Sequence, residues 1–568
     1  MKLNKLIYGI LGIFAFSSCA DKMEYHEYNN YDEDYVKLNF SNIGGLVTTI
    51  YLGLDTDFGN YSGALLASAS DESEYAYSSN QIADFYNGSW SSTNAKSSMW
   101  TSCYESIANC NLFLDKYTGL TFPELQLNED YQAQLNRYNN YQYEIRFLRA
   151  YFYFNLVRQY GDVPFSDHVL GAEESNTLTR RPAQEIFDFI ISECDAIKNE
   201  IVEDYSSLEV PLPSEPSETG RANKRAVLAL KARAALYAAS SLFNSTDDKT
   251  LWKRAATACK EVVDECKTKG MGLMDKYSAL WSVDNYKDTK EIILGRRANK
   301  ETSSMESYNF PTGLTGSSGG NCPTQTLVDA YETTDGKSYN ENGIYNAAAP
   351  YDNRDPRFEM TIAHNGTTGW PNWNEDALET YQNGANGEPL TGGTPTGYYL
   401  KKYCQGDIDL RDNSTKKSAY HTWITFRLGE FYLNYAEALF KYLDNPYLED
   451  PEFGVSANEM VNMTRNRADV KMPDFPSDLN NNDWWKKYKN ERMVELAFEG
   501  HRFWDVRRWK EANEHFKSIE EMKITKNGSG FTYNRTTVSR QWDDKMYFFP
   551  IPRTEIMKNT NLEQNPGW

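Results

Sequence analysis

The sequence predicts a mainly α-helical protein, a scaffold of stacked helical hairpins with long irregular loops. Three observations lead to this fold class. Apolar residues recur three or four apart along 186–201, the period of a helix with one buried face. Seven alanines fall between Ala226 and Ala239, and small side chains at helical spacing let two helices approach closely. Over 270–422 this regularity gives way to Gly, Asn, Thr and Pro, which are typical of loops.

Residues 1–18 are expected to be a secretion signal. Two lysines precede an apolar run that ends at Phe16 and is shorter than the roughly 20 residues that span a bilayer. The run is followed by Ser-Ser-Cys, which resembles a bacterial lipobox. The resemblance implies that Cys19 is lipidated, becomes the mature N-terminus and anchors the chain by its acyl groups.

A polar tract rich in Tyr, Asn and Asp follows the cysteine. Such a tract cannot bury a core, so we expect 19–40 to be a flexible tether. Acidic residues at Asp21 and Glu24 resemble the signal that exports lipoproteins to the surface of some Gram-negative bacteria. No later stretch is apolar over a membrane-spanning length, so we expect no transmembrane helix in the mature chain.

Residues 41–568 are expected to form one domain in three parts. An N-terminal part, 41–269, has TPR-like helical hairpins, in which the alanine-rich helix pairs with its successor. A loop-rich binding insert, 270–425, follows, because loops on a rigid scaffold commonly carry binding groups. A C-terminal helical part, 426–568, completes the domain. The helices are expected over 100–117, 146–160, 182–201, 222–243, 252–266, 427–443, 459–470 and 485–498.

Charge and motif content exclude several function classes. The chain carries 59 basic and 80 acidic residues, a net charge of -21, which disfavours nucleic acid and anionic lipid as partners. Seven further cysteines show no CxxC spacing and are expected to be small buried side chains. Six histidines form no HxxxH pair, so we expect no metal site and no cofactor; the many Asp and Asn could ligate Ca²⁺, but no EF-hand spacing occurs. No GxSxG, HExxH or GxxxxGK[ST] motif indicates an enzyme.

One helix carries three glutamates, Glu491, Glu495 and Glu499, that could suggest catalysis. They lie on one face of a single element, whereas glycosidases place paired carboxylates on opposite sides of the scissile bond. We therefore expect arginine–carboxylate pairs that hold the helix in place, formed with the nearby arginines 492, 502, 507 and 508.

Five segments, in order along the chain, resemble the SusD/RagB family of outer-membrane nutrient-binding lipoproteins. The resemblance implies one SusD-like domain, a nutrient that is most often a glycan, and no catalysis. It also implies a SusC-like, TonB-dependent transporter as partner, and a place at the outer membrane facing the cell exterior. The segments are 146–164, 322–336, 426–439, 490–509 and 547–568.

Candidate ligand residues follow from the chemistry of sugars. The chain has 40 Tyr, 27 Phe and 13 Trp, and aromatic faces stack on the C–H groups of sugar rings while polar groups meet the hydroxyls. Trp370 and Trp373 are favoured, because their Gly/Asn-rich loop offers little core to pack into. The full set is Asp71, Tyr75, Tyr77, Trp90, Tyr308, Trp370 and Trp373.

Two alternatives to a glycan-binding lipoprotein stay open. The same uptake architecture could carry peptides or protein fragments, which predicts a site with fewer exposed tryptophans. A surface glycoside hydrolase is the second alternative, and it predicts two convergent carboxylates in a cleft.

Overall fold

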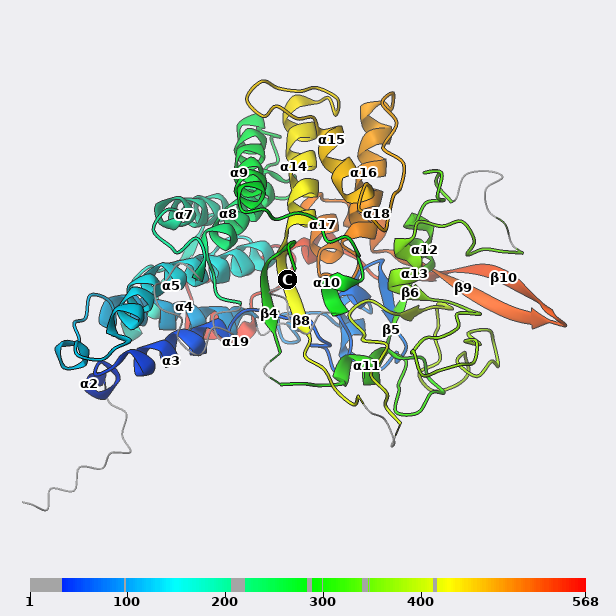
Figure 1. The fold of residues 1–568 in the computed structure, drawn as a ribbon, viewed down its shortest axis with the longest axis horizontal. Helices are drawn as coiled ribbons and strands as arrows, with labels where there is room; N and C mark the ends of the chain where they lie inside the picture. Colours follow the sequence, from blue (N-terminus) through cyan, green and yellow to red (C-terminus); the bar gives the residue numbers. More distant parts are fainter. Residues whose placement is uncertain are drawn as a thin grey trace, which may run out of the picture.

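The computed structural model describes residues 33–96, 99–205, 220–282, 289–298, 300–339, 346, 348–411 and 416–568 (Figure 1). The expected signal, Cys19 and most of the expected tether lie outside these residues. The tether itself ends earlier than predicted. A short helix, α2, spans Glu33–Val36, and Phe40 begins the next helix and is buried on Phe122 with ring centroids 4.2 Å apart.

Helices build the left and upper parts of the molecule in Figure 1, and short strands and loops fill the lower right. The longer helices are α3 (Phe40–Tyr51), α4 (Met99–Lys116), α5 (Tyr131–Tyr160), α7 (Ala183–Ile197), α8 (Lys224–Ala239), α9 (Lys249–Thr268), α14 (Leu428–Leu443), α15 (Ala457–Arg465) and α16 (Asn481–Glu495). The shorter ones are α6 (Ala172–Ser175), α10 (Ala279–Ser282), α11 (Ser304–Asn309), α12 (Gln325–Ala330), α13 (Arg357–Thr361), α17 (Arg502–Arg508), α18 (Ala512–His515) and α19 (Arg553–Lys558).

The long helices pack in sequence as a stack of hairpins. α4 lies on α5, α5 on α7, α7 on α8 and α8 on α9, and α9 then contacts α14, which packs on α15. The pairing of the alanine-rich helix with its successor is confirmed, because α8 and α9 share one of the largest interfaces in the fold. Every residue of α8 from Ala226 to its end is buried, so its small side chains are what allow neighbours on all sides.

The longest helix, α5, begins fifteen residues earlier than the predicted start at Arg146. Its first half buries polar groups such as Asn140 and Glu144, so apolar spacing does not reveal it. The Glu144 carboxylate accepts hydrogen bonds from Arg221 at 2.9 Å and from Asn140 at 2.8 Å. Those bonds compensate the carboxylate for the water that it loses on burial.

The expected loop-rich insert has more structure than predicted. It contributes a second hydrophobic core, with Phe310, Tyr331, Phe358 and Tyr399 among its buried side chains. The first strand of the insert, at Ile292–Arg297, pairs antiparallel with the strand at Thr422–Arg427, where the insert ends. The two ends of the insert therefore lie side by side. The paired strands are β1 (Ser73–Tyr75) with β5 (Asn321–Pro323), β2 (Val163–Pro164) with β3 (Arg180–Arg181), β4 (Ile292–Arg297) with β8 (Thr422–Arg427), β6 (Ile362–Ala363) with β7 (Tyr399–Leu400), and β9 (Ser518–Asn527) with β10 (Gly530–Ser539).

Buried ion pairs join the insert to the C-terminal helices. The structural role predicted for the three glutamates agrees with their contacts, but their partners come from distant segments and not from the four nearby arginines. Glu491 pairs with Arg357 at 2.6 Å, and Glu499 pairs with Lys402 at 2.7 Å. Burial alone would raise the pKa of the Glu495 carboxyl, but Arg467, Arg427 and Arg357 outweigh it and hold that pKa well below its usual range.

Three of the four nearby arginines pair with other acids, whereas Arg507 donates to the carbonyl oxygens of Phe503 and Met546. Arg492 contacts Asp505 at 2.7 Å, and Arg508 contacts Glu437 at 2.5 Å.

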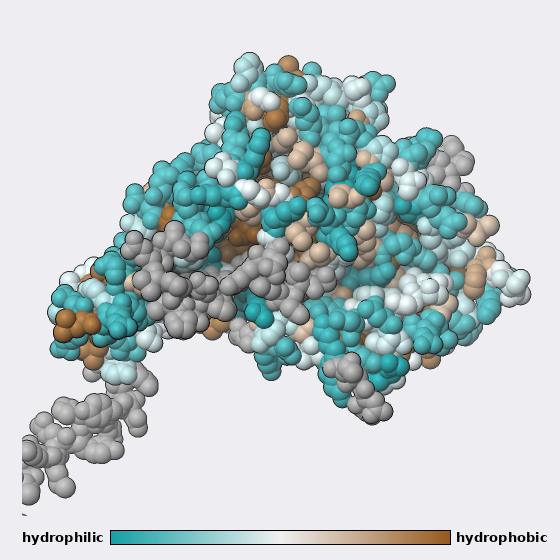
Figure 2. All heavy atoms as spheres, viewed as in Figure 1, coloured by the Kyte–Doolittle hydropathy of each residue, from teal (hydrophilic) through white to brown (hydrophobic). Residues whose placement is uncertain are grey.

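Over the face drawn in Figure 2, hydrophilic residues predominate and hydrophobic ones are scattered, as expected for an acidic surface in water.

Candidate functional site

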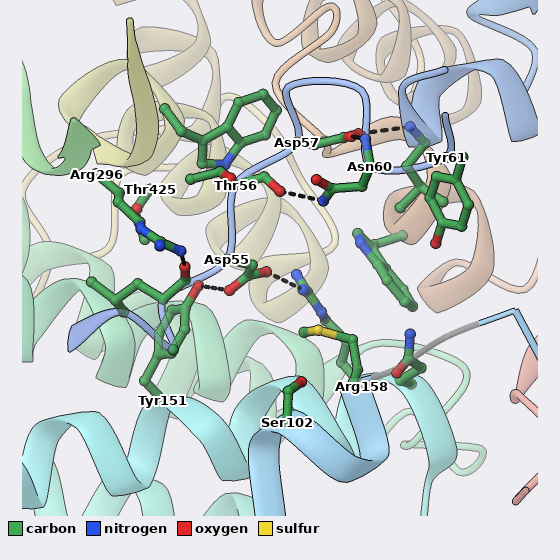
Figure 3. A pocket seen from close by; sticks show the side chains of 18 of the residues that line it. Asp55, Thr56, Asp57, Asn60, Tyr61, Ser102, Tyr151, Arg158, Arg296 and Thr425 are labelled. Carbon is green, nitrogen blue, oxygen red and sulfur yellow. Dashed lines mark hydrogen bonds and ion pairs between the residues drawn. The ribbon is translucent and has the colours of Figure 1, made fainter. Parts of the chain in front are cut away.

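A cavity of about 790 Å³ opens where the helical stack meets the insert. Its wall combines the loop after α3, the helix α5, the strand pair β4–β8 and the segment before α17 (Figure 3). The volume falls within the range of small-molecule sites, roughly 300–1,000 Å³. Residues from eight separate stretches of the sequence therefore line one space.

Asp55 lies on one wall of the cavity and is held by three donors. Its carboxylate accepts hydrogen bonds from the Tyr151 hydroxyl, from Asn155 Nδ2 at 2.9 Å and from Arg158 Nη2 at 3.2 Å (Figure 3). All three donors belong to α5, where they lie three or four residues apart and so share one face. The carboxylate and the guanidinium largely neutralise each other.

Asp57, two residues further on, shapes the adjoining turn. Its carboxylate accepts the backbone N–H of Leu66 at 2.6 Å and that of Asn60 at 3.5 Å. Burial raises the pKa of this carboxyl to about 6, against the lowering effect of those backbone bonds. At pH 7 the Asp57 carboxyl is thus mostly ionised, and its oxygens accept hydrogen bonds from the backbone of its own loop.

Two tryptophans supply ring surface to the cavity. Trp423, on β8, stacks on Tyr403 with centroids 5.2 Å apart and an interplanar angle of 18°. Trp504, on α17, lies under the Arg158 guanidinium, 4.5 Å from the ring centroid. Their neighbours fix both rings and leave Trp423 8% and Trp504 5% exposed, so only a small part of each ring reaches the cavity.

Arg296 is the cavity's cation without a carboxylate partner among the described residues. Its guanidinium donates to the Leu54 carbonyl oxygen (Figure 3). Burial lowers its pKa, and the charge of Asp55 partly offsets this. By contrast, Lys96 is paired with Asp84. Arg296 therefore keeps donor capacity toward the cavity.

His501 also lines the cavity, at the start of α17. Burial, with Arg233 nearby, lowers the pKa of its imidazole well below the usual value, so the ring is neutral at pH 7. Its carbonyl oxygen accepts the backbone N–H groups of Trp504 and Asp505, both at 2.9 Å, at the start of the helix.

The cavity thus offers amide, guanidinium and hydroxyl groups beside small parts of two fixed rings. Gln81, Gln159 and Asn60 supply amides, and Thr56 and Thr425 supply hydroxyls. Such a set can hydrogen-bond the hydroxyls of a sugar, while the exposed parts of the rings contact its C–H groups.

None of the seven ligand residues predicted from the sequence lines this cavity. Asp71 is 1% exposed, and both its oxygens pair with Arg502 at 2.7 and 2.8 Å. Trp90 is 2% exposed, and its ring packs edge-on against Phe549 with centroids 4.6 Å apart. Neither side chain is offered to solvent, because both hold the segment around β1 onto the C-terminal part of the chain.

Trp370 and Trp373 are also less available than predicted. Trp370 is 9% exposed and lies 5.5 Å from Phe310, ring to ring. Trp373 is partly buried, donates to the Ile408 carbonyl at 2.9 Å and carries the Arg411 guanidinium over its ring at 4.8 Å. The premise that their loop offers little core is wrong, since the loops of the insert pack on one another.

The three predicted tyrosines come together. Tyr75 and Tyr77 have ring centroids 5.7 Å apart, and Tyr75 is 6% exposed. Tyr308 packs against Gly63, close to Tyr75, and is 39% exposed. Tyr77 and Tyr308 keep accessible surface, and their role in ligand binding remains a prediction.

The residues that do line the cavity were missed by sequence reasoning. One local signal existed, the segment LGLDTDFGNY at 52–61, which gathers two aspartates, an asparagine and two glycines directly after a helix. The other walls come from positions such as Arg158, Arg296 and Trp423, which only tertiary folding brings together.

The described residues show neither a metal cluster nor a membrane-spanning helix. Within them, no three His, Cys, Asp or Glu side chains lie close enough together to hold a metal ion. No helix over the same ranges is both long and apolar enough to cross a membrane.

Comparison with models of protein families gives two matches. Residues 280–568 match the model of the SusD family. Residues 24–236 match a second model, described as starch-binding and associating with the outer membrane. Two SusD-like proteins of Formosa agariphila are 22% and 23% identical, over 73% and 83% of this chain and 70% and 80% of their own lengths.

Solved structures of similar proteins have the same fold. A SusD-like protein of Bacteroides fragilis has a TM-score of 0.76 at 26% identity, covering 94% of this chain and 98% of that one. A SusD-like carbohydrate binding protein of the same species has a TM-score of 0.74 at 23% identity, covering 93% and 100%. A laminarin binding SusD-like protein has a TM-score of 0.62 at 20% identity, covering 93% and 99%.

The mainly α-helical, TPR-like fold class predicted from the sequence is confirmed by these structures. The SusD model covers just over half of the 568 residues, and the second SusD-like match covers much of the remainder. This chain belongs to the SusD/RagB family.

Proposed function

We propose that the chain is a glycan-binding lipoprotein of the cell surface, which captures oligosaccharides and passes them to a SusC-like, TonB-dependent transporter. In this proposal Cys19 carries the lipid anchor, and the folded domain faces the exterior. Membership of a family described as starch-binding and outer-membrane-associated supports it. So do the carbohydrate binding and laminarin binding relatives that share the fold.

The observation that carries the proposal is the lining of the cavity. Three amide side chains, a guanidinium without a carboxylate partner among the described residues, and parts of two immobilised indole rings line a space large enough for a short oligosaccharide. Arg296 is the residue we expect to donate to sugar hydroxyls, because its charge is not consumed by a carboxylate.

The test compares two adjacent arginines on β4. Replacing Arg296 by Met removes the donor but keeps the aliphatic stem, and we expect glycan affinity to fall about tenfold, the loss of one charge-assisted hydrogen bond. Arg297→Met is the matched control, because Arg297 is exposed, lies 3.8 Å from the Tyr420 ring centroid and does not line the cavity.

Calorimetry with glycans selected on an array of plant, microbial and host oligosaccharides measures both variants. Equal affinity of Arg296→Met and wild type would remove this cavity as the binding site. Binding of peptides in place of every glycan would favour the peptide-carrying alternative.

A hydrolase remains the second alternative, and the cavity does contain three carboxylates, of which Glu499 is paired with Arg427 and Lys402. Asp55 is engaged by three donors of α5, and Asp57 by the backbone of its own turn, which favours a structural role for each. Incubating the protein with the bound polysaccharide and assaying reducing ends tests this directly. If wild type releases reducing ends and Asp57→Asn does not, the proposal that the protein only binds glycans is overturned.

A further inference from the structure

The cavity continues onto a tight turn that reaches Tyr308. Asn60 and Tyr61 line the cavity, and the chain then turns through Ser62 to Gly63. Three residue steps separate Asn60 from Gly63, so the turn extends no more than about 11 Å from the cavity rim. A ligand that filled the cavity and was a few sugar rings longer would pass along this turn.

Tyr308 offers a ring at the far end of that path. It lies on α11, is 39% exposed, and its Cδ1 would come 3.1 Å from a side chain on Gly63. The ring therefore rests on glycine backbone. Its hydroxyl has no hydrogen-bond partner among the described residues. An exposed ring that rests on backbone and has a free hydroxyl can stack on one sugar and hydrogen-bond to its hydroxyls.

The turn between the cavity and Tyr308 is held in an unusual conformation. Ser62 has a φ of 56°, in the left-handed region that a residue with a side chain rarely adopts. Three side chains fix it. Its carbonyl oxygen accepts from the Tyr75 hydroxyl at 3.4 Å and from Asn80 at 3.2 Å, and its hydroxyl accepts from Gln81 at 3.2 Å.

Gln81 lines the cavity as well, so one amide links the cavity wall to this turn. Left-handed residues that the surroundings hold in place are concentrated at ligand sites, where they keep a surface ready for binding. Asn60, Ser62 and Gln81 are all exposed and present polar groups along the path toward Tyr308.

We propose that Tyr308 and the Gly59–Gly63 turn form an outer subsite, which holds the sugar rings of a longer oligosaccharide where they leave the cavity. The inference rests on the proposed function and adds to it a preference for chain length. Short glycans fill the cavity alone. Longer chains of the same glycan gain a contact with Tyr308 and bind more tightly.

The experiment uses the full-length chain and an array that carries each plant, microbial and host glycan as a series from disaccharide to octasaccharide. We expect wild-type affinity to rise with length. Tyr308→Ala should lose about tenfold for the longest members and less than about twofold for the shortest, while Tyr308→Phe keeps most of the gain. Phe531→Ala is the matched control, since Phe531 is 37% exposed and lies on β10.

Each outcome is decisive. An equal loss at all lengths in Tyr308→Ala, no loss at any length, or a wild-type affinity independent of length overturns the outer subsite and leaves the cavity proposal standing. Wild type that binds no glycan of any length overturns the proposed function, and the subsite with it.

Discussion

Glu72 is a carboxyl group in the core without an ionic partner. It is 1% exposed, one oxygen accepts the Phe498 N–H at 3.1 Å, and the other makes no hydrogen bond to a described residue. Burial, reinforced by the charge of Asp71, raises its pKa to about 8. The folded protein therefore keeps a proton on Glu72 at pH 7, while the unfolded chain releases it at an ordinary glutamate pKa.

This arrangement predicts that the protein loses stability as pH rises. Between the unfolded and the folded pKa the folded state binds more protons, so the free energy of unfolding falls by up to roughly 1.4 kcal/mol per pH unit. Glu72→Gln cannot titrate and should escape this loss. Urea unfolding of both proteins at pH 5 and pH 8 measures it, and we expect the variant to gain on wild type at pH 8. If wild type and Glu72→Gln differ in free energy of unfolding by the same amount at both pH values, Glu72 does not have the raised pKa.

Individual residues were also where sequence reasoning succeeded least. The buried state of Asp71 and Trp90 depends on partners more than 400 positions away, Arg502 and Phe549, and no local pattern reveals such contacts. Tyr308 keeps accessible surface, because its short helix lies in a loop region and packs on glycine, and its role in binding stays a prediction.

At the scale of elements, β8 and α16 are clamped by Arg427. Its guanidinium bonds Glu499 at 2.7 Å, Glu291 at 2.9 Å and Glu495 at 2.8 Å, and all four side chains are at most 1% exposed. Removing the Arg427 guanidinium takes one ionic partner from each of three buried carboxylates, and breaking buried ion pairs in this way strongly destabilises a protein.

We expect Arg427→Met to lower the free energy of unfolding by about 3–5 kcal/mol, since it breaks buried pairs from one side. Arg411→Met is the control. Arg411 pairs with Asp409 at 2.6 Å but is half exposed, and an exposed pair contributes less than about 1 kcal/mol. Denaturant unfolding measures both. Similar losses in the two variants would show that the clamp does not hold the elements together.

One-sided burial helped to locate some elements. α7 and α9 bury one stripe and were predicted within a few residues. α14 was predicted equally well, although it is buried on all sides from Leu428 to Phe440. α3 was missed because two glycines interrupt it, and β10 because exposed residues occupy most of both its faces. The insert was taken for loops, since its second core is assembled from short, irregular segments.

For the whole molecule, the prediction concerns where the folded domain is displayed. If Cys19 is the anchor, the full-length chain fractionates with the outer membrane, and a protease added to intact cells digests the domain. Cys19→Ala should move the protein to the soluble fraction while its thermal unfolding stays unchanged, because the described domain begins at Glu33. Protection from protease in intact cells, with digestion only after lysis, would contradict exposure on the surface.

The pairing of β4 with β8 has a consequence for how this architecture can diversify. Because the two strands are hydrogen-bonded neighbours, the segment between them leaves and rejoins the helical body at adjacent points. Insertions or deletions between these anchor points need not change the distance that the chain must span. Arg296 and Trp423 lie on the strands themselves. Related proteins can therefore differ in the segment between the strands and in the ligand it binds, while these two residues still line the cavity.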